Sequence, residues 1–255
     1  MKSIRKLTIA DKINVEDNYF ILKCFSAEAL PEMFPGQFAS IKVENNPNVF
    51  LRRPFSIHDY CPETNEVSFL IKIVGKGTCS LSKLSVNQQI DVILPLGNGF
   101  NLNKSGKALI IGGGCGIAPI FFLAKKLKSM NADFDILIGG RSCHDLLCYK
   151  ELSGLSHLYC TTEDGSEGTK GYVTNHNCLI DNNIDYKRIY CCGPENMLKA
   201  VAKHAKERDI FCEVSLENHM ACGIGVCLCC VTETIHGNEC VCSQGPVFNI
   251  KDLKW

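Results

Sequence analysis

Six cysteines near the carboxyl end of the chain have the side-chain type and spacing of a metal or cluster site. They are Cys222, Cys227, Cys229, Cys230, Cys240 and Cys242. The first stretch follows the plant-type pattern for a [2Fe–2S] cluster, Cys222-x4-Cys227-x2-Cys230, and further cysteines come after a gap. Two irons bridged by two sulfides need four thiolate ligands in all. The spacing predicts such a cluster and leaves Cys240 and Cys242 open as its fourth ligand.

Two other uses of these cysteines remain open. A structural zinc site could form from the pairs Cys227-x2-Cys230 and Cys240-x-Cys242. A disulfide is the weaker alternative, since disulfide frameworks belong to short secreted chains. Gly223 and Gly225 favour the cluster, because glycines let the backbone curl around it and direct N–H groups at sulfur.

Two short motifs in the first hundred residues could bind a flavin nucleotide. Arg53-Pro54-Phe55-Ser56 offers a guanidinium for a pyrophosphate and a hydroxyl for a flavin ring. Gly75-Lys76-Gly77-Thr78 could begin a helix whose amino end accepts a phosphate. Each motif is short, so a common sequence without function and an ordinary glycine turn are the alternatives.

A third glycine-rich segment, residues 112–116, lies between an expected strand and an expected helix, as a phosphate loop does. It does not fit G-x-G-x-x-G, because the third glycine position falls on Ile117. Gly140-Arg141 stands where a standard Rossmann site has a carboxylate for the ribose. The sequence therefore disfavours that site but allows a nucleotide site of different geometry. Cys192-Gly193-Pro194 ends a later strand at the edge where such sheets bind ligands.

The elements that must position these motifs change in character near residue 100. Before it, alternating apolar residues and turn signals predict a small antiparallel β-barrel. Its expected strands are Phe20–Phe25, Gln37–Val43, Pro54–His58, Val67–Val74 and Ile90–Leu94. Beyond it, strands alternate with helices, which predicts a doubly wound parallel sheet. Its expected strands are Ala108–Ile111, Phe134–Ile138, Leu158–Thr162 and Ile189–Cys192, with helices after Pro119 and after Pro194. From Glu217 onward we expect loop, a short hairpin and cysteines.

We therefore expect a barrel over residues 1–100, a nucleotide-type α/β domain over 101–215 and a cysteine module over 216–255. Hydrophobic residues make up 45% of the chain, and 27 basic side chains balance 27 acidic ones. This composition argues against disorder, nucleic-acid binding and a polybasic membrane anchor. The start lacks the apolar run of a secretory signal, and glycines and a proline interrupt the longest apolar segment. We expect a soluble, cytoplasmic protein, in which most of the 17 cysteines are small apolar side chains.

In their order along the chain, these signals resemble the ferredoxin–NADP reductase superfamily. The resemblance rests on Arg-Pro-aromatic-Ser, GGGCGIAP and CCGPENM. EVSLENHMACGIGVCLCCV, CVCSQGPVF and TTEDGSEGTKGYVT narrow it to electron-transfer subunits of class B dihydroorotate dehydrogenase. The likeness covers essentially the whole chain, and the cysteine segment is its most specific part.

The resemblance implies an FAD-binding β-barrel, an NAD-binding α/β domain and a C-terminal [2Fe–2S] module. It implies FAD contacts from Arg53, Pro54, Phe55, Ser56, Leu70, Ile71, Lys72, Gly77 and Thr78. We expect NAD contacts from Gly113, Gly114, Gly116, Cys192, Gly193 and Pro194. The implied cluster ligands are Cys222, Cys227, Cys230 and Cys242. Cys242 fits because the family's last ligand precedes Gly-Pro-Val-Phe by two residues.

The implied activity is electron transfer between NAD(H), FAD and the cluster, to or from FMN in a separate catalytic subunit that converts dihydroorotate to orotate in pyrimidine biosynthesis. The implied assembly is a heterotetramer of two copies of each subunit, and no side chain of this chain is expected to act as general acid or base. The nearest alternative is the small subunit of a sulfide dehydrogenase or of an NADH-dependent ferredoxin:NADP reductase. An alternative of another class is a zinc-stabilised binding protein without a redox role. NADH versus NADPH stays open at Arg141.

Overall fold

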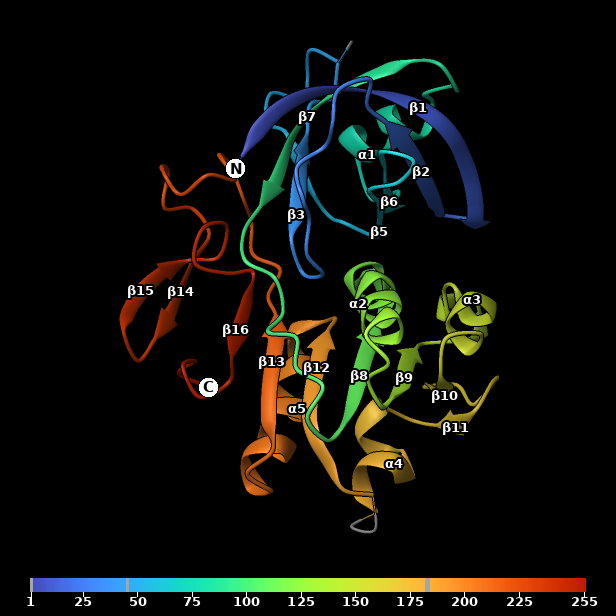
Figure 1. Cartoon of the computed structure of the whole chain (residues 1–255), viewed down its shortest axis with the longest axis vertical. Helices are drawn as coiled ribbons and strands as arrows, with labels where there is room; N and C mark the ends of the chain where they lie inside the picture. The colour runs from blue at the N-terminus through green and yellow to red at the C-terminus, as the bar shows by residue number, and fades with distance from the viewer. Residues whose placement is uncertain (1, 45, 182–183) are drawn as a thin grey trace.

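The computed structural model describes residues 2–44, 46–181 and 184–255, which form two seven-stranded sheets and a separate two-stranded hairpin. In Figure 1 the antiparallel sheet lies above the parallel sheet, and the carboxyl-terminal segment runs along one side of both. No helix in these described ranges is long and apolar enough to cross a membrane.

The first sheet has the strand order β4-β3-β7-β1-β2-β6-β5 and is antiparallel throughout. Its strands are β1 (Ser3–Glu16), β2 (Tyr19–Phe25), β3 (Phe38–Ile41), β4 (Arg53–Ser56), β5 (Asp59–Cys61), β6 (Glu66–Lys72) and β7 (Gln89–Leu96), with α1 (Lys76–Ser82) before β7. The link between the two edge strands closes the sheet. Ile57 N donates to Gln37 O at 3.0 Å, and His58 N donates to Ser68 O at 2.9 Å. The expected barrel is confirmed.

Two barrel strands were not expected from the sequence, β1 and β5. β1 is the longest strand, but only Leu7 and Ile9 along it are fully buried. The rest of β1 alternates between partly and fully exposed residues, so its sequence has no strong apolar period. β5 has three residues, which is too short for any pattern to show.

The second sheet has the order β11-β10-β9-β8-β12-β13-β16, and its strands are parallel except for β16. Its strands are β8 (Lys107–Gly113), β9 (Phe134–Gly140), β10 (His157–Thr162), β11 (Thr169–Lys170), β12 (Tyr186–Cys192), β13 (Phe211–Ser215) and β16 (Val247–Asn249). Its helices are α2 (Ile117–Ser129), α3 (Tyr149–Ser153), α4 (Asn177–Ile180) and α5 (Glu195–Glu207). Short 3-10 turns are η1 (Gly114–Gly116), η2 (Cys143–Asp145) and η3 (Val173–Asn175).

Alternate residues of β8 belong to different cores, one on each face of this sheet. Leu109 and Ile111 pack in the core that contains residues of α4 and α5. Ala108 and Ile110 pack in the core that contains residues of α2 and α3. Helices therefore cover both faces, and the expected doubly wound sheet is confirmed. β13 was not expected, because it carries Glu213, a buried carboxylate that accepts from Asn101 N at 2.8 Å.

The carboxyl-terminal segment joins both sheets rather than standing apart. The strands β14 (Val231–Thr234) and β15 (Gly237–Cys240) form its hairpin, and β16 pairs with β13 at the edge of the parallel sheet. Asn98, which follows the last barrel strand, donates from its backbone N to Gly245 O at 2.6 Å and from Nδ2 to Gln244 O at 2.7 Å. Phe38 and Leu96 of the barrel share one buried core with Cys230 and Cys242.

Candidate cofactor sites

Residues 216–230 form neither helix nor strand, and this cysteine loop carries three of the four expected cluster ligands. Gly223, Gly225 and Leu228 have φ angles of 69°, 91° and 57°. Glycine adopts positive φ without strain, so the two glycines allow the tight curl that the sequence predicts. A Cβ at Gly223 would lie 3.7 Å from Leu96 Cδ1 and from Ser40 Oγ, so the loop runs along β3 and β7 of the barrel.

Cys222 lies inside the curl, and its sulfur accepts three backbone N–H groups. The donors are Ile224 N at 3.5 Å, Val226 N at 3.4 Å and Cys227 N at 3.4 Å. Burial alone would raise the pKa of Cys222, but these N–H groups and the Cys227 thiol lower it to about 6. N–H groups directed at a thiolate stabilise the charged form that binds metal.

Cys230 and Cys242 form a second, buried pair with exposed fractions of 2% and 0%. Cys242 N donates to Cys230 Sγ at 3.4 Å. Burial and the hydrogen bond with Cys230 raise the pKa of Cys242 to about 12. This thiol therefore needs a metal to hold it as thiolate at neutral pH.

The expected ligands thus lie as two hydrogen-bonded pairs, Cys222 with Cys227 and Cys230 with Cys242. Within the described ranges, no group of three or more His, Cys, Asp or Glu side chains is arranged to hold a metal ion. A tetrahedral zinc site needs four ligands around one centre, whereas each iron of a [2Fe–2S] cluster needs two. Two pairs of thiols match the two ligands that each iron of a [2Fe–2S] cluster takes.

The two remaining cysteines of the segment differ in exposure. Cys240 is buried and shares a hydrogen bond with Cys230. Burial, the charge of Cys230 and this hydrogen bond raise the pKa of Cys240. Cys240 therefore contacts the same sulfur as Cys242 does, whereas Cys229 is exposed and belongs to neither pair.

The two expected flavin motifs meet at the end of the barrel. Arg53 on β4 extends over the start of α1, because a Cβ at Gly77 would lie 2.9 Å from Arg53 Nε. Thr78 Oγ1 accepts from Val74 N at 2.9 Å and holds the turn that precedes α1. A guanidinium above this backbone is suited to a pyrophosphate.

The expected flavin residues on β6 face different ways. Leu70 packs in the core beneath α2, and Ile71 packs in the barrel core. Their side chains are engaged in packing, so contact with a flavin would fall to their backbone. Lys72 Nζ lies 4.9 Å from the centre of the Tyr19 ring, and both residues line the cleft described next.

A cleft of about 770 Å³ opens at the carboxyl ends of the parallel strands, where open α/β sheets bind nucleotides. Gly113, Gly114 and Pro194 line it, as the sequence predicts for NAD. Gly116, Cys192 and Gly193 are not among the lining residues. They pack beneath the cleft, where a Cβ at Gly116 would lie 2.2 Å from Cys192 O. These three shape the floor by allowing the start of α2 to approach β12.

Arg141, at which the sequence leaves NADH versus NADPH open, lines the outer part of this cleft. Sequence reasoning missed the other polar residues there, which are Asp145, Glu163, Tyr172, Thr174 and Asn196, and the buried Thr161 beside them. Asp145, five residues beyond β9, accepts from Arg141 N at 3.2 Å and lies 3.7 Å from Arg141 Nε. A carboxylate therefore does stand at the end of the second parallel strand, although it comes from the following turn. For Asp145 and Glu163, the signal available in the sequence was their position shortly after the ends of β9 and β10.

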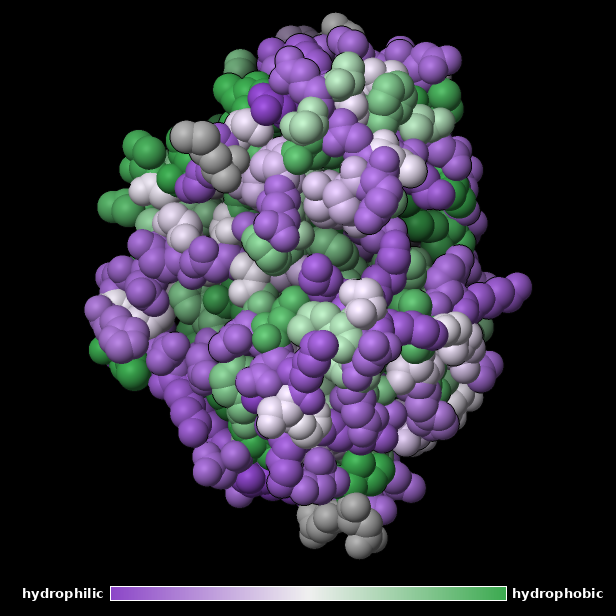
Figure 2. Space-filling model, in the orientation of Figure 1, coloured by the Kyte–Doolittle hydropathy of each residue, from purple (hydrophilic) through white to green (hydrophobic). Residues whose placement is uncertain are grey.

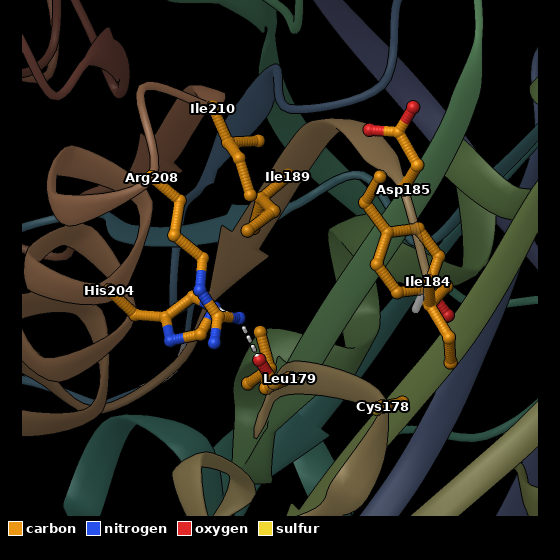
Figure 3. Close-up of a pocket in the computed structure, with 9 residues that line it drawn as sticks. Cys178, Leu179, Ile184, Asp185, Ile189, His204, Arg208 and Ile210 are labelled. Atoms are coloured by element: carbon orange, nitrogen blue, oxygen red, sulfur yellow. Dashed lines mark hydrogen bonds between the residues drawn. The ribbon is translucent and has the colours of Figure 1, made fainter. Parts of the chain in front are cut away.

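A smaller cavity of about 190 Å³ lies at the opposite end of the parallel sheet (Figure 3). The Arg208 guanidinium, whose Nη1 lies 2.8 Å from His204 Nε2, donates to Leu179 O and, at 3.0 Å, to Ile180 O. None of the expected site residues lines this cavity. The guanidinium of Arg208 already donates its hydrogen bonds to the backbone carbonyls of Leu179 and Ile180.

The fold is that of ferredoxin reductases. The chain superposes on a solved NADH-dependent reduced ferredoxin–NADP oxidoreductase with a TM-score of 0.88 and 29% identity, covering 98% of this chain and 90% of that one. A ferredoxin reductase of carbazole 1,9a-dioxygenase shares the fold at a TM-score of 0.71 and 19% identity, over 82% and 67% of the two chains.

Residues 217–254 match the iron–sulfur cluster binding domain of dihydroorotate dehydrogenase B, and residues 110–203 match the oxidoreductase NAD-binding domain. The dihydroorotate dehydrogenase B (NAD(+)) electron transfer subunit of Clostridium acetobutylicum is 40% identical over 94% of this chain and 93% of its own. That of Shouchella clausii is 33% identical over 97% of both. The chain belongs to the family of dihydroorotate dehydrogenase B electron transfer subunits.

Family and fold together confirm the expected class, an oxidoreductase subunit for electron transfer. They also confirm the expected cofactors, FAD, a [2Fe–2S] cluster and NAD(H). An electron transfer subunit implies a separate catalytic subunit as its partner.

Proposed function

We propose that this chain passes electrons between NAD(H), FAD and a [2Fe–2S] cluster, to or from the FMN of a dihydroorotate dehydrogenase catalytic subunit. In the overall reaction, dihydroorotate loses two electrons and two protons; NAD⁺ takes both electrons and one proton as hydride, and the other proton goes to water. The observation that carries the proposal is the cysteine loop, with its thiols in two pairs, lying against the barrel beside β3 and β7.

The proposed cluster ligands are Cys222, Cys227, Cys230 and Cys242. The proposed FAD contacts are Arg53, Pro54, Phe55, Ser56, Leu70, Ile71, Lys72, Gly77 and Thr78. The proposed NAD site is the cleft, lined by Gly113, Gly114 and Pro194 and supported by Gly116, Cys192 and Gly193. A bound flavin exchanges electron pairs with a nicotinamide and single electrons with an iron–sulfur cluster, which links the two other cofactors.

The chain's own part in this chemistry is to bind and orient. Arg53 supplies positive charge over the backbone at Gly77, where a pyrophosphate needs it. The N–H groups directed at Cys222 stabilise its thiolate, and such hydrogen bonds also tune cluster potential. We also propose the division into residues 1–100, 101–215 and 216–255 as one cofactor for each segment, although β16 of the last segment completes the sheet of the second.

The exposed apolar side chains of the cysteine loop support docking of the catalytic subunit there. Ile224, Val226 and Leu228 are 42%, 77% and 64% exposed. Figure 2 shows hydrophobic atoms projecting at the upper left, where this loop lies in Figure 1. Contiguous apolar residues around an exposed site are typical of a protein interface. We propose an assembly of two copies of each subunit, located in the cytoplasm.

The outer cleft favours NAD over NADP. A 2′-phosphate there would face the carboxylates of Asp145 and Glu163, and the single guanidinium of Arg141 is already paired with Asp145. A ribose diol, in contrast, can donate to a carboxylate. Replacing Asp145 by Asn should raise the affinity for NADP⁺ relative to NAD⁺ by about tenfold, since one like charge is removed and Arg141 is freed. Equal ratios of the two dissociation constants in wild type and variant would contradict this assignment.

The proposal is tested on anaerobically purified protein by its visible spectrum with iron, sulfide and flavin assays. We expect two irons, two sulfides and one FAD per chain, and bleaching of both chromophores on addition of NADH. Colourless protein with one zinc per chain would support the binding-protein alternative instead.

A second candidate is supported by the 29% identity and the TM-score of 0.88 to the NADH-dependent reduced ferredoxin–NADP oxidoreductase. Both candidates bind the same cofactors, so the partner distinguishes them. Co-purification with an FMN protein that oxidises dihydroorotate supports the first, and co-purification with a larger iron–sulfur flavoprotein supports the second.

A further inference from the structure

Helix α2 connects the two nucleotide-binding parts of the molecule. It begins directly after the glycine segment of the cleft, and Ile120 and Leu123 pack in the core of the parallel sheet. Phe122 of the same helix, which is 5% exposed, lies in the core of the barrel instead. One helix is therefore anchored in both domains.

A buried histidine meets the start of this helix. His58 is 3% exposed, and its Nδ1 lies 3.3 Å from Ala118 O. Its ring stacks on Phe121 with centroids 4.6 Å apart and planes inclined by 21°. Because a carbonyl oxygen only accepts, Nδ1 carries the proton and donates to Ala118.

An ion pair lies beside the histidine and joins the same two elements. Lys125 Nζ, on α2, lies 2.5 Å from Asp59 Oδ2, on β5. Both side chains are partly exposed, at 40% and 27%. A half-exposed pair contributes little to stability, but it fixes the rotation of α2 against the barrel.

His58 and Ala118 each lie close in sequence to one of the two expected cofactor motifs. His58 follows Ser56, the last residue of the flavin motif, by two residues. Ala118 follows Gly116, which ends the glycine segment of the cleft, by two residues. The backbone of His58 is itself fixed, because its N donates to Ser68 O at 2.9 Å in the closure of the barrel. The hydrogen bond thus joins a residue just beyond the flavin motif to a residue just beyond the glycine segment of the cleft.

We propose that His58 is a positioning residue, whose hydrogen bond to Ala118 sets the distance between the flavin motif and the dinucleotide loop and thereby the rate of hydride transfer between nicotinamide and flavin. This inference rests on the function proposed above. Hydride transfer depends steeply on the separation of donor and acceptor, so a small shift of α2 against the barrel changes the rate.

A direct catalytic part for His58 does not fit its surroundings. Phe121 covers one face of its ring, Ala118 O accepts the hydrogen bond from Nδ1, and only 3% of the residue is exposed. Burial lowers the pKa of His58 to about 4, so the ring is neutral at neutral pH. It acts through the backbone that it holds.

The test compares two variants of the holoprotein. His58→Phe keeps a stacked ring and removes the donor, whereas His58→Asn places an amide N–H where Nδ1 stands and removes the ring. In stopped-flow reduction of the flavin at saturating NADH, we expect His58→Phe to be slower by at least about tenfold and His58→Asn to stay within about threefold of wild type. FAD content, flavin potential and the dissociation constant for NAD⁺ should be unchanged in both.

A second pair of variants tests the same contact without touching the core. Lys125→Met removes the ion pair with Asp59 and should slow flavin reduction by a few fold. Lys126→Met is the control, since Lys126 neighbours it on α2 and has no ion pair in the part of the chain that the structure describes.

The outcomes separate this inference from the proposed function. Wild-type protein whose flavin is not reduced by NADH contradicts the proposed function. A normal rate in His58→Phe, or an equal loss in His58→Phe and His58→Asn, overturns the positioning role. Loss of FAD or of NAD⁺ affinity in His58→Phe overturns it as well, because the residue would then serve binding. If His58→Phe does not fold, the comparison of Lys125→Met with Lys126→Met decides, and equal rates overturn the inference.

Discussion

The walls of the dinucleotide cleft are the ends of hydrogen-bonded parallel strands, whereas residues 216–230 of the cysteine loop form neither helix nor strand. Hydrogen bonds between β8, β9, β10 and β12 hold the lining residues of the cleft in register. In the cysteine loop, backbone N–H groups of the loop itself, rather than strands of a sheet, surround the sulfur of Cys222. A nucleotide that comes and goes needs a site that persists without it, whereas a resident cluster can supply the bonds that order its own loop.

The largest effect should come from removing one ligand of the loop. Cys222→Ser should abolish the cluster absorbance and the iron content, since a serine cannot supply the thiolate that three N–H groups stabilise. The flavin absorbance and the affinity for NAD⁺ should remain. Cys143→Ser, which changes an exposed cysteine outside the loop, is the control. If cluster and flavin are lost together, the two regions are not independent.

The second prediction is that acid destabilises the protein through His58, which lies between the barrel and helix α2. Burial lowers the pKa of His58 to about 4. The charge of Asp59, the hydrogen bond to Ala118 and the charge of Glu151 oppose this effect, and the charge of Lys125 adds to it. The unfolded chain takes up a proton near pH 6.5 and the folded chain only near pH 4. The stability due to neutral His58 is therefore complete above pH 6.5 and is lost as the pH falls toward 4, by on the order of 3 kcal/mol.

Urea unfolding at several pH values measures this loss. His58→Phe has no group that titrates there, so its unfolding free energy should decline less steeply between pH 6.5 and 4 than that of wild type. Parallel curves for the two proteins would show that His58 does not titrate in this way.

The next prediction concerns the floor of the cleft, where the backbone packs so closely that Gly116 should not tolerate a side chain. A methyl group at Gly116 would lie 2.2 Å from Cys192 O and 2.6 Å from Gly193 N, which are backbone atoms that cannot rotate away. Gly116→Ala should lower the free energy of unfolding by about 2 kcal/mol and weaken NAD⁺ binding. Gly154→Ala is the control, since its methyl group would meet only Glu151 O at 3.4 Å and Lys150 O at 3.8 Å. Equal stability of both variants would mean that the floor is looser than the structure indicates.

The smallest effect concerns the outer surface of the cysteine loop. Val226→Asp places a charge on a side chain that is 77% exposed, so the cluster should stay intact. Binding to the catalytic subunit should weaken by about tenfold, because a carboxylate would be buried in the interface. Val86→Asp, at a barrel residue that is 48% exposed and lies in the turn before β7, is the control. Binding constants measured by calorimetry that do not differ between the two variants would place the interface elsewhere.

The sequence predicts the fold well where periodicity is strong. The apolar alternation of β6 and the buried runs of β8 and β9 identify both sheets. β1 and β13 escape prediction because their burial depends on partners distant in sequence. β13 carries Glu213, which is acceptable inside only because Asn101 N donates to it.

The candidate sites divide in the same way. The cysteine ligands are close in sequence, so their spacing alone predicts the cluster. Spacing does not distinguish Cys240 from Cys242 as the fourth ligand. The structure does not separate them by burial either, because both thiols are buried near Cys230. The resemblance to the family selects Cys242. The polar residues of the outer cleft, such as Asp145 and Glu163, come from separate turns that only the folded sheet brings together.

The edge strand β16 has a practical consequence for engineering this chain. Cutting after Leu216, to obtain a simpler flavoprotein reductase without iron, would unpair Val214 and Ser215 of β13 along one side. It would also uncover Phe38 and Leu96, which pack beside Cys230 and Cys242. An open strand edge next to bare apolar side chains invites self-association. To stay monomeric, a shortened protein of this kind needs another segment, such as a designed β-hairpin, that pairs with β13 and covers these apolar side chains.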